Sequence, residues 1–479
     1  MAIKDYLQKK ILLHFGFSPT KDQELLFNKL ADFVDNTSSV STIMLITGYA
    51  GTGKSSSIGA LIRSLKELNI KYRLMAPTGR SAKVLSNYAK EGASTIHKAI
   101  YRQKSLADAV PQFVLDYNKS KNTIFIVDEA SLISFSTASD GGVLFGSGSL
   151  LDDLIEYIFS RDLGNKLIIL GDTAQLPPIG LDYSPALDAQ FLSQYGEVTE
   201  SNLTEVVRQE VESGILYNAT NLRREIKEQD NRDFIFKLDG FSDIERLSGS
   251  DLIDTLSDSI SKYGDEQVVV LCRSNLRANR YNMGIRSMVY FREERLCGGD
   301  RLMIVKNSYK FKSSDESLDF IANGDVAVLE KISNYSNRYG FNFAEVKLSF
   351  PDYGDIEVEG KVILDTLESK SASLTKEEQN RLFNGVYEDY SNIKRKRDRI
   401  NKVKEDDYFN AFQIKYATAI TGHKSQGGQW RCVFIDNPFW QEELTIEDKK
   451  WLYTALTRAV EKVYLVNFSD NYFCEKPLR

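Results

Sequence analysis

The stretch Thr42-Ile-Met-Leu-Ile-Thr-Gly-Tyr-Ala-Gly-Thr-Gly-Lys-Ser55 decides the fold, because an apolar run ends in a glycine-rich loop that opens a helical segment. The eight residues 48–55 match the spacing of a phosphate loop, in which backbone amides and a helix N-terminus face phosphate oxygens. Further apolar runs occur at 72–76, 123–127 and 166–170. With the helical segment 55–68, these runs predict an α/β unit with buried parallel strands.

A second set of apolar runs follows, at 268–272, 431–435 and 462–466, with a helical segment at 447–460. It predicts a second α/β unit. Between 300 and 407 the chain contains short runs at 300–305, 325–329, 343–348 and 356–364, divided by Gly, Asn, Asp and Ser, which predict a small β-barrel. Thr375 and Glu378 have the spacing of a capping box, which predicts that a helix follows the barrel.

The predicted domain order follows from these patterns. The first lobe occupies residues 1–200, and the second lobe begins at 201–299. The barrel and its helices fill 300–407, and 408–479 completes the second lobe. A length of 479 residues agrees with two to four domains, and 42% hydrophobic and 27% charged residues are typical of soluble globular proteins.

Charge and hydropathy exclude several classes of protein. The apolar runs are much shorter than the roughly 20 residues of a membrane span, and the first residues lack the pattern of a secretory signal. We therefore expect a cytoplasmic protein with no membrane partner. A net charge of −6 excludes a general basic coat for nucleic acid, so any such contact must be local.

The cysteines are scattered along the chain, as Cys272, Cys297, Cys432 and Cys474, and there are only three histidines. This distribution predicts buried free thiols, and it disfavours disulfides or a zinc site.

The phosphate loop and an acidic pair predict a site for ATP and Mg²⁺. Asp128 and Glu129 end the run 123–127, where Asp128 is expected to hold Mg²⁺ through water and Glu129 to deprotonate the attacking water. In the loop, Lys54 is expected to reach the β- and γ-phosphates and Ser55 to bind Mg²⁺. The expected nucleotide contacts of the loop are Gly48, Gly51, Thr52, Gly53, Lys54 and Ser55.

Gln23 has two interpretations that can coexist. Thr20 and Gln23 have the spacing of a capping box at a helix start. Alternatively, the Gln23 amide could hold the adenine edge, which presents one donor and one acceptor.

Three more stretches decide between an ordinary nucleotide hydrolase and a motor. Residues 171–180 read Gly-Asp-Thr-Ala-Gln-Leu-Pro-Pro-Ile-Gly, 416–428 contain His-Lys-Ser-Gln-Gly, and 453–458 read Tyr-Thr-Ala-Leu-Thr-Arg. Together they resemble superfamily 1 helicases, and the first two forms resemble the RecD, Dda and Pif group, superfamily 1B. The resemblance runs from Gln23 to Arg458. It implies two RecA-like lobes with parallel sheets, a small hairpin insert at 98–122, and an SH3-like β-barrel with a helical insert in the second lobe.

The resemblance also implies roles for single residues. Gln175 would sense the γ-phosphate, and Arg208 and Arg458 would act as arginine fingers from across the cleft. Gln426 and Gly427 would lie near the nucleotide.

A track for single-stranded DNA is implied as well, with hydroxyls and lysines suited to contact with the phosphate backbone. Its expected residues are Pro77, Thr78, Lys83, Thr95 and His97 in the first lobe, and Ser274, Asn275, Thr421, His423, Lys424 and Ser425 in the second. Either histidine could instead belong to the core.

Tyr101 or Phe113 could be a strand-separating wedge or a core residue. The loop 134–149 is expected to be mobile, and the basic run 394–399 could grip phosphates or form a solvated helix face.

Three functions fit these patterns. The leading one is an ATP-dependent DNA helicase that moves 5′-to-3′ on single-stranded DNA and acts on forked or tailed duplexes, a polarity that the resemblance implies. An RNA-directed motor or a translocase without strand separation would use the same nucleotide site. A kinase or signalling ATPase without a polynucleotide partner would leave the second-lobe motifs unexplained. A monomer suffices for the motor, and contacts to other replication or repair proteins are open.

Overall fold

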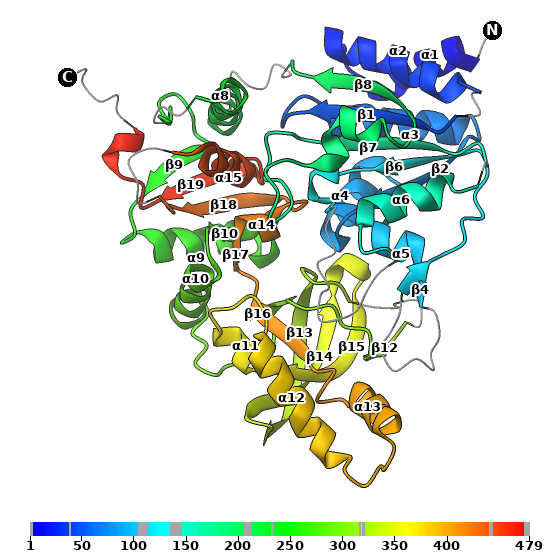
Figure 1. Cartoon of the computed structure of the whole chain (residues 1–479). Coiled ribbons are helices and arrows are strands. Elements are labelled where there is room, and N and C mark those ends of the chain that lie inside the picture. Colours follow the sequence, from blue (N-terminus) through cyan, green and yellow to red (C-terminus); the bar gives the residue numbers. More distant parts are fainter. Residues whose placement is uncertain are drawn as a thin grey trace.

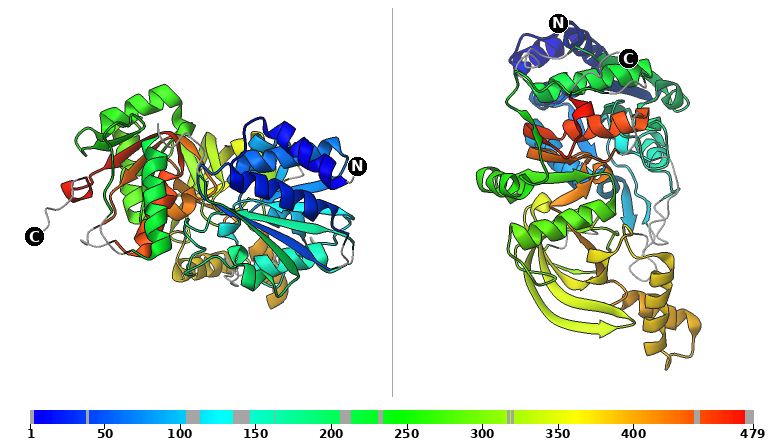
Figure 2. Two further views of the ribbon diagram at one scale, coloured as in Figure 1. Left: turned by 90° about the horizontal axis from the view of Figure 1, so that it is seen from above. Right: turned by 90° about the vertical axis from the view of Figure 1, so that its left-hand side faces the viewer.

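The chain folds into two α/β lobes that lie side by side and a β-barrel below them (Figure 1). This computed structural model describes residues 3–37, 40–103, 113–134, 146–161, 163–205, 213–230, 234–315, 318, 321–439 and 444–473. Seen from above, the two lobes lie next to each other, and seen from the side, the barrel with its helices extends away from both (Figure 2). The predicted fold class is confirmed.

The first lobe is built on a six-stranded parallel sheet in the order β3-β2-β6-β7-β1-β8. Its strands are β1 (Thr42–Gly48), β2 (Lys71–Ala76), β3 (Ala93–Thr95), β6 (Thr123–Val127), β7 (Lys166–Gly171) and β8 (Glu197–Leu203). All the described strand ends that carry candidate site residues lie at one edge of this sheet, because parallel strands place their carboxyl ends together.

Helices cover both faces of this sheet, as the unbroken apolar runs of the central strands predict. Successive side chains of β1 alternate, so that Met44 and Ile46 join one apolar cluster while Ile43 and Leu45 join the other. The first cluster packs under α1 (Ile3–Phe15), α2 (Lys21–Asp35), α3 (Lys54–Glu67) and α4 (Gly79–Ala89). The second packs under α5 (Ile96–Ile100), α6 (Leu150–Phe159) and α7 (Ala189–Leu192).

The second lobe has a five-stranded parallel sheet in the order β17-β10-β18-β19-β9. Its strands are β9 (Ile244–Leu247), β10 (Val268–Cys272), β17 (Ala419–Thr421), β18 (Trp430–Asp436) and β19 (Ala459–Val466). Its helices are α8 (Gly214–Glu228), α9 (Leu252–Tyr263), α10 (Asn275–Met288), α14 (Gly422–Ser425) and α15 (Ile446–Leu456). The predicted helix 447–460 was wrong at its end, because Ala459 already pairs with Trp430 and Val460 lies in β19.

The barrel closes through five strands in the order β15-β14-β13-β11-β16, with β16 returning to β15 and β12 outside on β15. These strands are β11 (Arg301–Ile304), β12 (Lys312–Ser313), β13 (Val326–Arg338), β14 (Phe341–Phe350), β15 (Ile356–Ile363) and β16 (Phe412–Tyr416). Sequence analysis assigned the stretch that forms β16 to the second lobe. It pairs with β11 instead, Leu302 opposite Tyr416.

Three helices extend from the barrel: α11 (Asp365–Glu368), α12 (Lys376–Asp389) and α13 (Lys396–Glu405). The capping box at the start of α12 is present, because Thr375 Oγ1 accepts the Glu378 N–H at 3.3 Å and the Glu378 carboxylate accepts the Thr375 N–H at 2.8 Å.

The first lobe also carries a two-stranded antiparallel hairpin, β4 (Tyr101–Gln103) and β5 (Phe113–Leu115). Residues between these strands, and residues 135–145 of the loop predicted to be mobile, lie outside the described part of the chain. Cys272 and Cys432 are buried free thiols, while Cys297 is free and only half-buried, and Cys474 lies outside the described residues. None of the described helices is long and apolar enough to span a bilayer.

Candidate functional site

The phosphate loop connects the end of β1 to α3 with a backbone that only glycine adopts easily. Gly51 and Gly53 both have φ of 78°. Lys54 folds back onto the loop, where its Nζ donates to the Tyr49 carbonyl at 2.9 Å and to the Gly48 carbonyl. Ser55 is exposed at the start of α3. The loop therefore presents backbone amides, a lysine and a hydroxyl at one helix N-terminus, which suits a polyphosphate.

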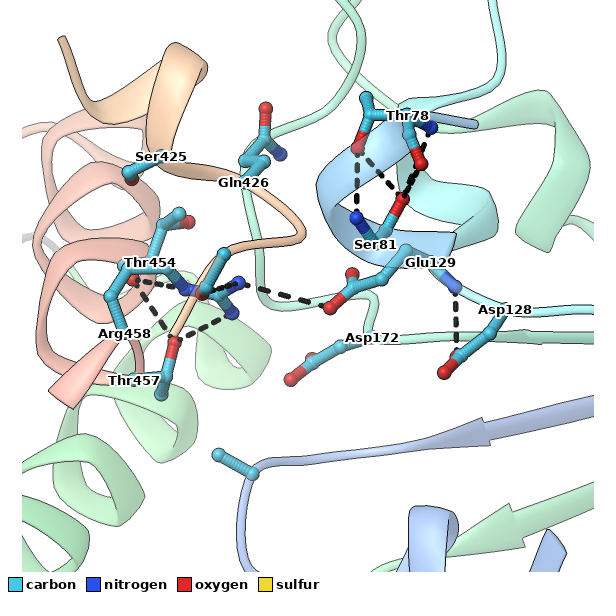
Figure 3. Close-up of polar contacts among 12 residues, drawn as sticks. Thr78, Ser81, Asp128, Glu129, Asp172, Ser425, Gln426, Thr454, Thr457 and Arg458 are labelled. Atoms are coloured by element: carbon cyan, nitrogen blue, oxygen red, sulfur yellow. Dashed lines mark hydrogen bonds and ion pairs between the residues drawn. The ribbon is translucent and has the colours of Figure 1, made fainter. Parts of the chain in front are cut away.

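The acidic pair follows β6 and diverges because Glu129 adopts a left-handed conformation with φ of 52°. The Glu129 N–H donates to Asp128 Oδ1 at 2.8 Å, and the Tyr88 hydroxyl donates to Asp128 Oδ2. This turn points the Glu129 carboxylate into the cleft, where Oε1 lies 3.8 Å from Nη1 of Arg458 (Figure 3).

The electrostatics at Glu129 suit a general base. Burial raises the pKa of its carboxyl above the ordinary range, and Asp128 and Asp172 raise it further, while Arg458 and Lys54 oppose that rise. A base whose pKa lies nearer neutrality accepts a proton more readily than an ordinary carboxylate does.

The segment after β7, residues 172–176, here called the β7 loop, is hydrogen-bonded to the second lobe. The Leu176 N–H donates to Thr454 Oγ1 at 2.9 Å, and Gln426 Nε2 donates to the Leu176 carbonyl at 2.7 Å. Between these contacts, Gln175 is 7% exposed, and its Oε1 has no hydrogen-bond partner among the described residues. This buried acceptor lines a cavity of about 400 Å³ that Lys450 of α15 completes.

Tyr453 of α15 contacts both loops of the first lobe. Its hydroxyl donates to Asp172 Oδ2 at 2.6 Å and accepts the Ala50 N–H of the phosphate loop at 3.0 Å. Sequence reasoning gave Tyr453 no role, although it opens the quoted stretch 453–458.

Both the oxygen and the nitrogen of the Gln23 amide form hydrogen bonds in the described structure. Its Oε1 accepts the Thr20 N–H at 2.9 Å, which completes the capping box at the start of α2, and its Nε2 donates to the Thr52 carbonyl at 3.0 Å. The capping box is therefore present, and it fixes Gln23 against the phosphate loop. The contact with adenine stays a prediction.

Of the two residues predicted to act as arginine fingers, the structure describes only Arg458. Arg458 is 4% exposed and is held by the carbonyls of Thr454 and Gly428, each at 3.2 Å. Arg208 lies outside the described residues. Gly427, with φ of 72°, packs against α4, where an added Cβ would lie 2.8 Å from the Cβ of Ser81. The second-lobe loop 426–428 thus reaches both the nucleotide site and the start of α4.

Four of the hydroxyl residues predicted for a strand track share one structural position. Each is the N-cap of a helix that follows an edge strand of its sheet or the strand beside it: Thr78 of α4, Thr95 of α5, Ser274 of α10 and Thr421 of α14. Pro77 and Asn275 flank two of these caps. Four helix N-termini, two from each lobe, therefore stand at carboxyl edges of the two sheets, where backbone amides favour anions.

The charged residues predicted for the track contact the barrel in this structure. Lys83 Nζ donates to the Pro351 carbonyl at 3.2 Å and lies 3.2 Å from Asp352 Oδ1, and Lys424 Nζ donates to Asn323. Ser425 is fully buried and its hydroxyl donates to the Gly422 carbonyl. The first-lobe track is thus bordered by the barrel.

Both histidines are partly buried and favour the neutral form. Burial lowers the pKa of His97 to about 4, although Asp153 opposes this. Burial and then Arg273 lower the pKa of His423. Neutral imidazoles can donate a hydrogen bond to a phosphate, but they add no charge.

Two comparisons with protein families match this geometry in chain order. The model described as "AAA domain" matches residues 31–237, and the model described as "UvrD-like helicase C-terminal domain" matches residues 416–466. The two matched ranges contain the phosphate loop, the acidic pair, the β7 loop and the second-lobe residues hydrogen-bonded to it. Over these ranges the chain is similar to RecD-like helicases of superfamily 1B.

Several relatives share part of their sequence with this chain. The ATP-dependent RecD2 DNA helicase of Deinococcus radiodurans is 26% identical over 210 residues, which are 43% of this chain and 25% of that protein. An uncharacterized protein of Methanocaldococcus jannaschii is 24% identical over 472 residues, covering 88% of this chain. The chain spans only 36% of the length of that relative. A crystal structure of Pif1 helicase from Bacteroides with ADP-AlF3 and ssDNA aligns with 96% of this chain and 95% of its own, at 15% identity and a TM-score of 0.46.

The site fits ATP and Mg²⁺ on its own geometry. The left-handed glycines open the loop backbone, the Gln175 amide oxygen has no hydrogen-bond partner in the described part of the chain, and Ser55 is exposed beside the phosphate loop. Among the described residues no group of three or more His, Cys, Asp or Glu side chains could hold a metal by itself. A Mg²⁺ ion held by Ser55 and Asp128 would therefore depend on phosphate oxygens for its other ligands.

The hairpin formed by β4 and β5 has a buried base. Tyr101 is 9% exposed and its hydroxyl donates to Asp153 Oδ2 at 2.6 Å, while Phe113 is 5% exposed. The Phe113 ring lies 4.9 Å from the ring of Tyr309, which belongs to the loop before β12. In the described structure both wedge candidates are therefore core residues.

Two further features were missed or left open by the sequence. Arg80 of α4 stacks over the Trp430 ring of the second lobe, 3.9 Å from its centroid, and no local pattern could have paired these residues.

In the basic run, residues 394–398 are exposed, while Arg399 stacks on Tyr387 at 3.6 Å. The run is a solvated surface at the start of α13, and its contact with phosphates stays a prediction.

Proposed function

We propose that the chain is an ATP-driven motor that moves 5′-to-3′ along single-stranded DNA and unwinds forked or tailed duplexes. The observation that carries the proposal is the hydrogen-bonded junction between the lobes. The phosphate loop and the β7 loop of the first lobe contact Tyr453, Thr454 and Gln426 of the second. ATP hydrolysis at this site would therefore change the contact between the two lobes. Each lobe carries helix N-caps at the carboxyl edge of its sheet.

The nucleotide step assigns a role to each side chain. ATP supplies the phosphoanhydride bond, and Mg²⁺ neutralises its charge. Lys54 binds the β- and γ-phosphates, and Ser55 and Asp128 hold the metal. Glu129 accepts the proton of the attacking water at a carboxylate oxygen, and Arg458, 3.8 Å away, stabilises the charge that spreads over the transferred phosphoryl group.

Movement follows from the placement of the strand contacts. Thr78 and Thr95 hold the strand on the first lobe, and Ser274 and Thr421 hold it on the second. Closure of the cleft shortens the distance between the two grips, and their alternate release turns each cycle into a step. Arg208 would add a second arginine finger.

The choice of DNA over RNA and the 5′-to-3′ direction rest on similarity to other proteins. DNA is favoured over RNA because RecD2, a relative by sequence, is named a DNA helicase. The 5′-to-3′ direction comes from the resemblance to superfamily 1B. Apart from the stretch that forms β16, which belongs to the barrel, the domain limits given above stay predictions, as do the cytoplasmic location and the sufficiency of a monomer.

An unwinding assay with four partial duplexes tests the proposal. The substrates carry a 5′ or a 3′ single-stranded tail, each made of DNA or of RNA. We expect release of the labelled strand only from the duplex with the 5′ DNA tail, and only with ATP and Mg²⁺. Lys54→Ala is the matched control, because it removes the phosphate contact and leaves the strand track intact. Unwinding from 3′ tails would refute the polarity, and ATP hydrolysis without any response to either polymer would refute the motor.

A further inference from the structure

The hydroxyl of Tyr453 lies where three elements meet. Tyr453 is 1% exposed, within α15 of the second lobe. Its hydroxyl accepts the Ala50 N–H of the phosphate loop at 3.0 Å and donates to Asp172 Oδ2 of the β7 loop at 2.6 Å. One phenol therefore links both nucleotide-site loops of the first lobe to the second lobe.

The direction of these two hydrogen bonds is fixed by chemistry. Burial and the neighbouring Asp172 raise the pKa of the Tyr453 hydroxyl well above its ordinary range, so the phenol keeps its proton and can donate. Asp172 Oδ1 already accepts the Ala174 N–H at 2.9 Å, which leaves Oδ2 for the phenol. The backbone amide of Ala50 can only donate, so the phenol oxygen is its acceptor.

A phosphate in the loop would compete for the same amide. Amides of the phosphate loop face phosphate oxygens when such a loop is occupied, and a charged oxygen is a stronger acceptor than a neutral phenol. When the Ala50 N–H turns to a phosphate, Tyr453 loses one of its two partners. The change is felt in α15, because the next residue, Thr454, holds the β7 loop and the helix leads directly to Arg458.

We propose that Tyr453 is a positioning residue that couples occupancy of the phosphate loop to the grip of the second lobe on the strand. The inference rests on the proposed function, since it requires that both nucleotide and strand bind. It names a route for coupling that does not pass through the arginine fingers: Ala50, then the Tyr453 hydroxyl, then Asp172 and α15.

Tyr281 provides a matched control within the same lobe. Its hydroxyl donates to Asp436 Oδ1 at 2.5 Å, and Asp436 is 1% exposed. Tyr281→Phe therefore removes a phenol from a buried aspartate, as Tyr453→Phe does, but without any contact to the nucleotide loops in the described structure. A merely structural effect of losing such a phenol should appear in both variants.

The test is a thermodynamic cycle on the full chain. Affinity for a fluorescent dT oligonucleotide is measured by anisotropy with and without ADP plus aluminium fluoride, and the ratio of the two dissociation constants gives the coupling. We expect a wild-type ratio that differs from unity by at least about fivefold, the lower end for coupled sites. Tyr453→Phe should bring the ratio within about twofold of unity while each separate affinity stays within about threefold. Tyr281→Phe should keep the wild-type ratio.

Different results would overturn the role of Tyr453 and the proposed function. A wild-type coupling that persists in Tyr453→Phe overturns the inference, as does an equal loss in Tyr281→Phe. If Tyr453→Phe does not fold by circular dichroism, Asp172→Asn weakens the same hydrogen bond and should lower the coupling in the same direction; an unchanged ratio there would also overturn the inference. If the wild-type chain binds the nucleotide analogue but no oligonucleotide, the proposed function itself fails, and the inference fails with it.

Discussion

In the proposed mechanism Arg458 sets the pH at which Glu129 can act as a base, and removal of Arg458 should shift the pH dependence of ATP hydrolysis. The carboxyl of Glu129 has a raised pKa because of burial and of Asp128 and Asp172, and Arg458 restrains that rise. Hydrolysis needs the deprotonated carboxylate, so the rate falls as the pH drops through this pKa. In Arg458→Ala the restraint is lost, the pKa rises further, and the acid limb of the pH–rate profile moves to higher pH.

The size of the shift follows from the distance between the two charges. Nη1 of Arg458 and Oε1 of Glu129 are 3.8 Å apart, and their side chains are 4% and 23% exposed. Unit charges at this distance attract by about 1 kcal/mol in bulk water and by about 4 kcal/mol at an effective dielectric constant near 20. Since about 1.4 kcal/mol corresponds to one pKa unit, we expect the acid limb to move up by about 1 to 3 pH units.

The assay is phosphate release under single-turnover conditions, with excess enzyme and saturating oligonucleotide, between pH 5 and 9. Excess enzyme is needed because loss of an arginine finger slows hydrolysis by about a thousandfold or more. Arg223→Ala is the control: it removes a cation stacked 4.2 Å from the Tyr49 ring of the phosphate loop, with no described contact to Glu129. An acid limb in Arg458→Ala that stays at the wild-type pH or moves down would refute the assignment of Glu129 as the base restrained by Arg458.

Three further predictions concern the loop, the lobe contact and the barrel. Lys54→Ala should abolish ATP hydrolysis and leave binding of a single-stranded oligonucleotide largely unchanged; near-normal turnover would remove the phosphate-loop assignment. Arg80→Gln removes the stack on Trp430, worth about 1 kcal/mol, so DNA-stimulated hydrolysis should fall about fivefold, and equal stimulation would contradict a role in lobe closure. Asp325 is 4% exposed, and burial raises the pKa of its carboxyl from 3.8 to about 7 although Tyr353 donates to it at 2.7 Å. Its folded state therefore favours the protonated form, and stability is lost as the pH rises towards and through 7, by up to about 4 kcal/mol. The melting temperature of wild type should fall between pH 5 and 8 by more than that of Asp325→Asn, and parallel melting curves would contradict this.

The sequence predicts the parts of the fold that local patterns determine. Apolar runs gave the central strands of both sheets, and the glycine spacing of residues 48–55 gave the loop and the helix after it. The capping boxes at Thr20 and Thr375 are local as well, and both are present. Short or polar strands were missed: β9 has only four residues, and β16 looked like part of the second lobe.

The contacts that make the site join residues far apart in the sequence, and local sequence patterns cannot predict such pairs. Ala50 and Tyr453 are 403 positions apart, and Lys83 and Pro351 are 268 apart. The resemblance implied that Lys83 contacts the strand, and only the folded barrel shows that the ammonium group of Lys83 lies 3.2 Å from an Asp352 carboxylate oxygen. Motif reasoning thus located the nucleotide site, and tertiary packing decided which side chains join it to the second lobe.

The closure of the barrel has a consequence for how such a chain can change. β11 and β16 are its first and last strands, and they are neighbours: Leu302 pairs with Tyr416, and the Ala417 N–H donates to the Arg301 carbonyl at 2.9 Å. More than a hundred residues therefore leave and re-enter the second lobe at nearly the same point. A module whose two ends meet can be lengthened, shortened or exchanged for another without altering the register of β10 and β17. The inserted barrel can therefore change in evolution while the second lobe and the adjacent nucleotide chemistry stay the same.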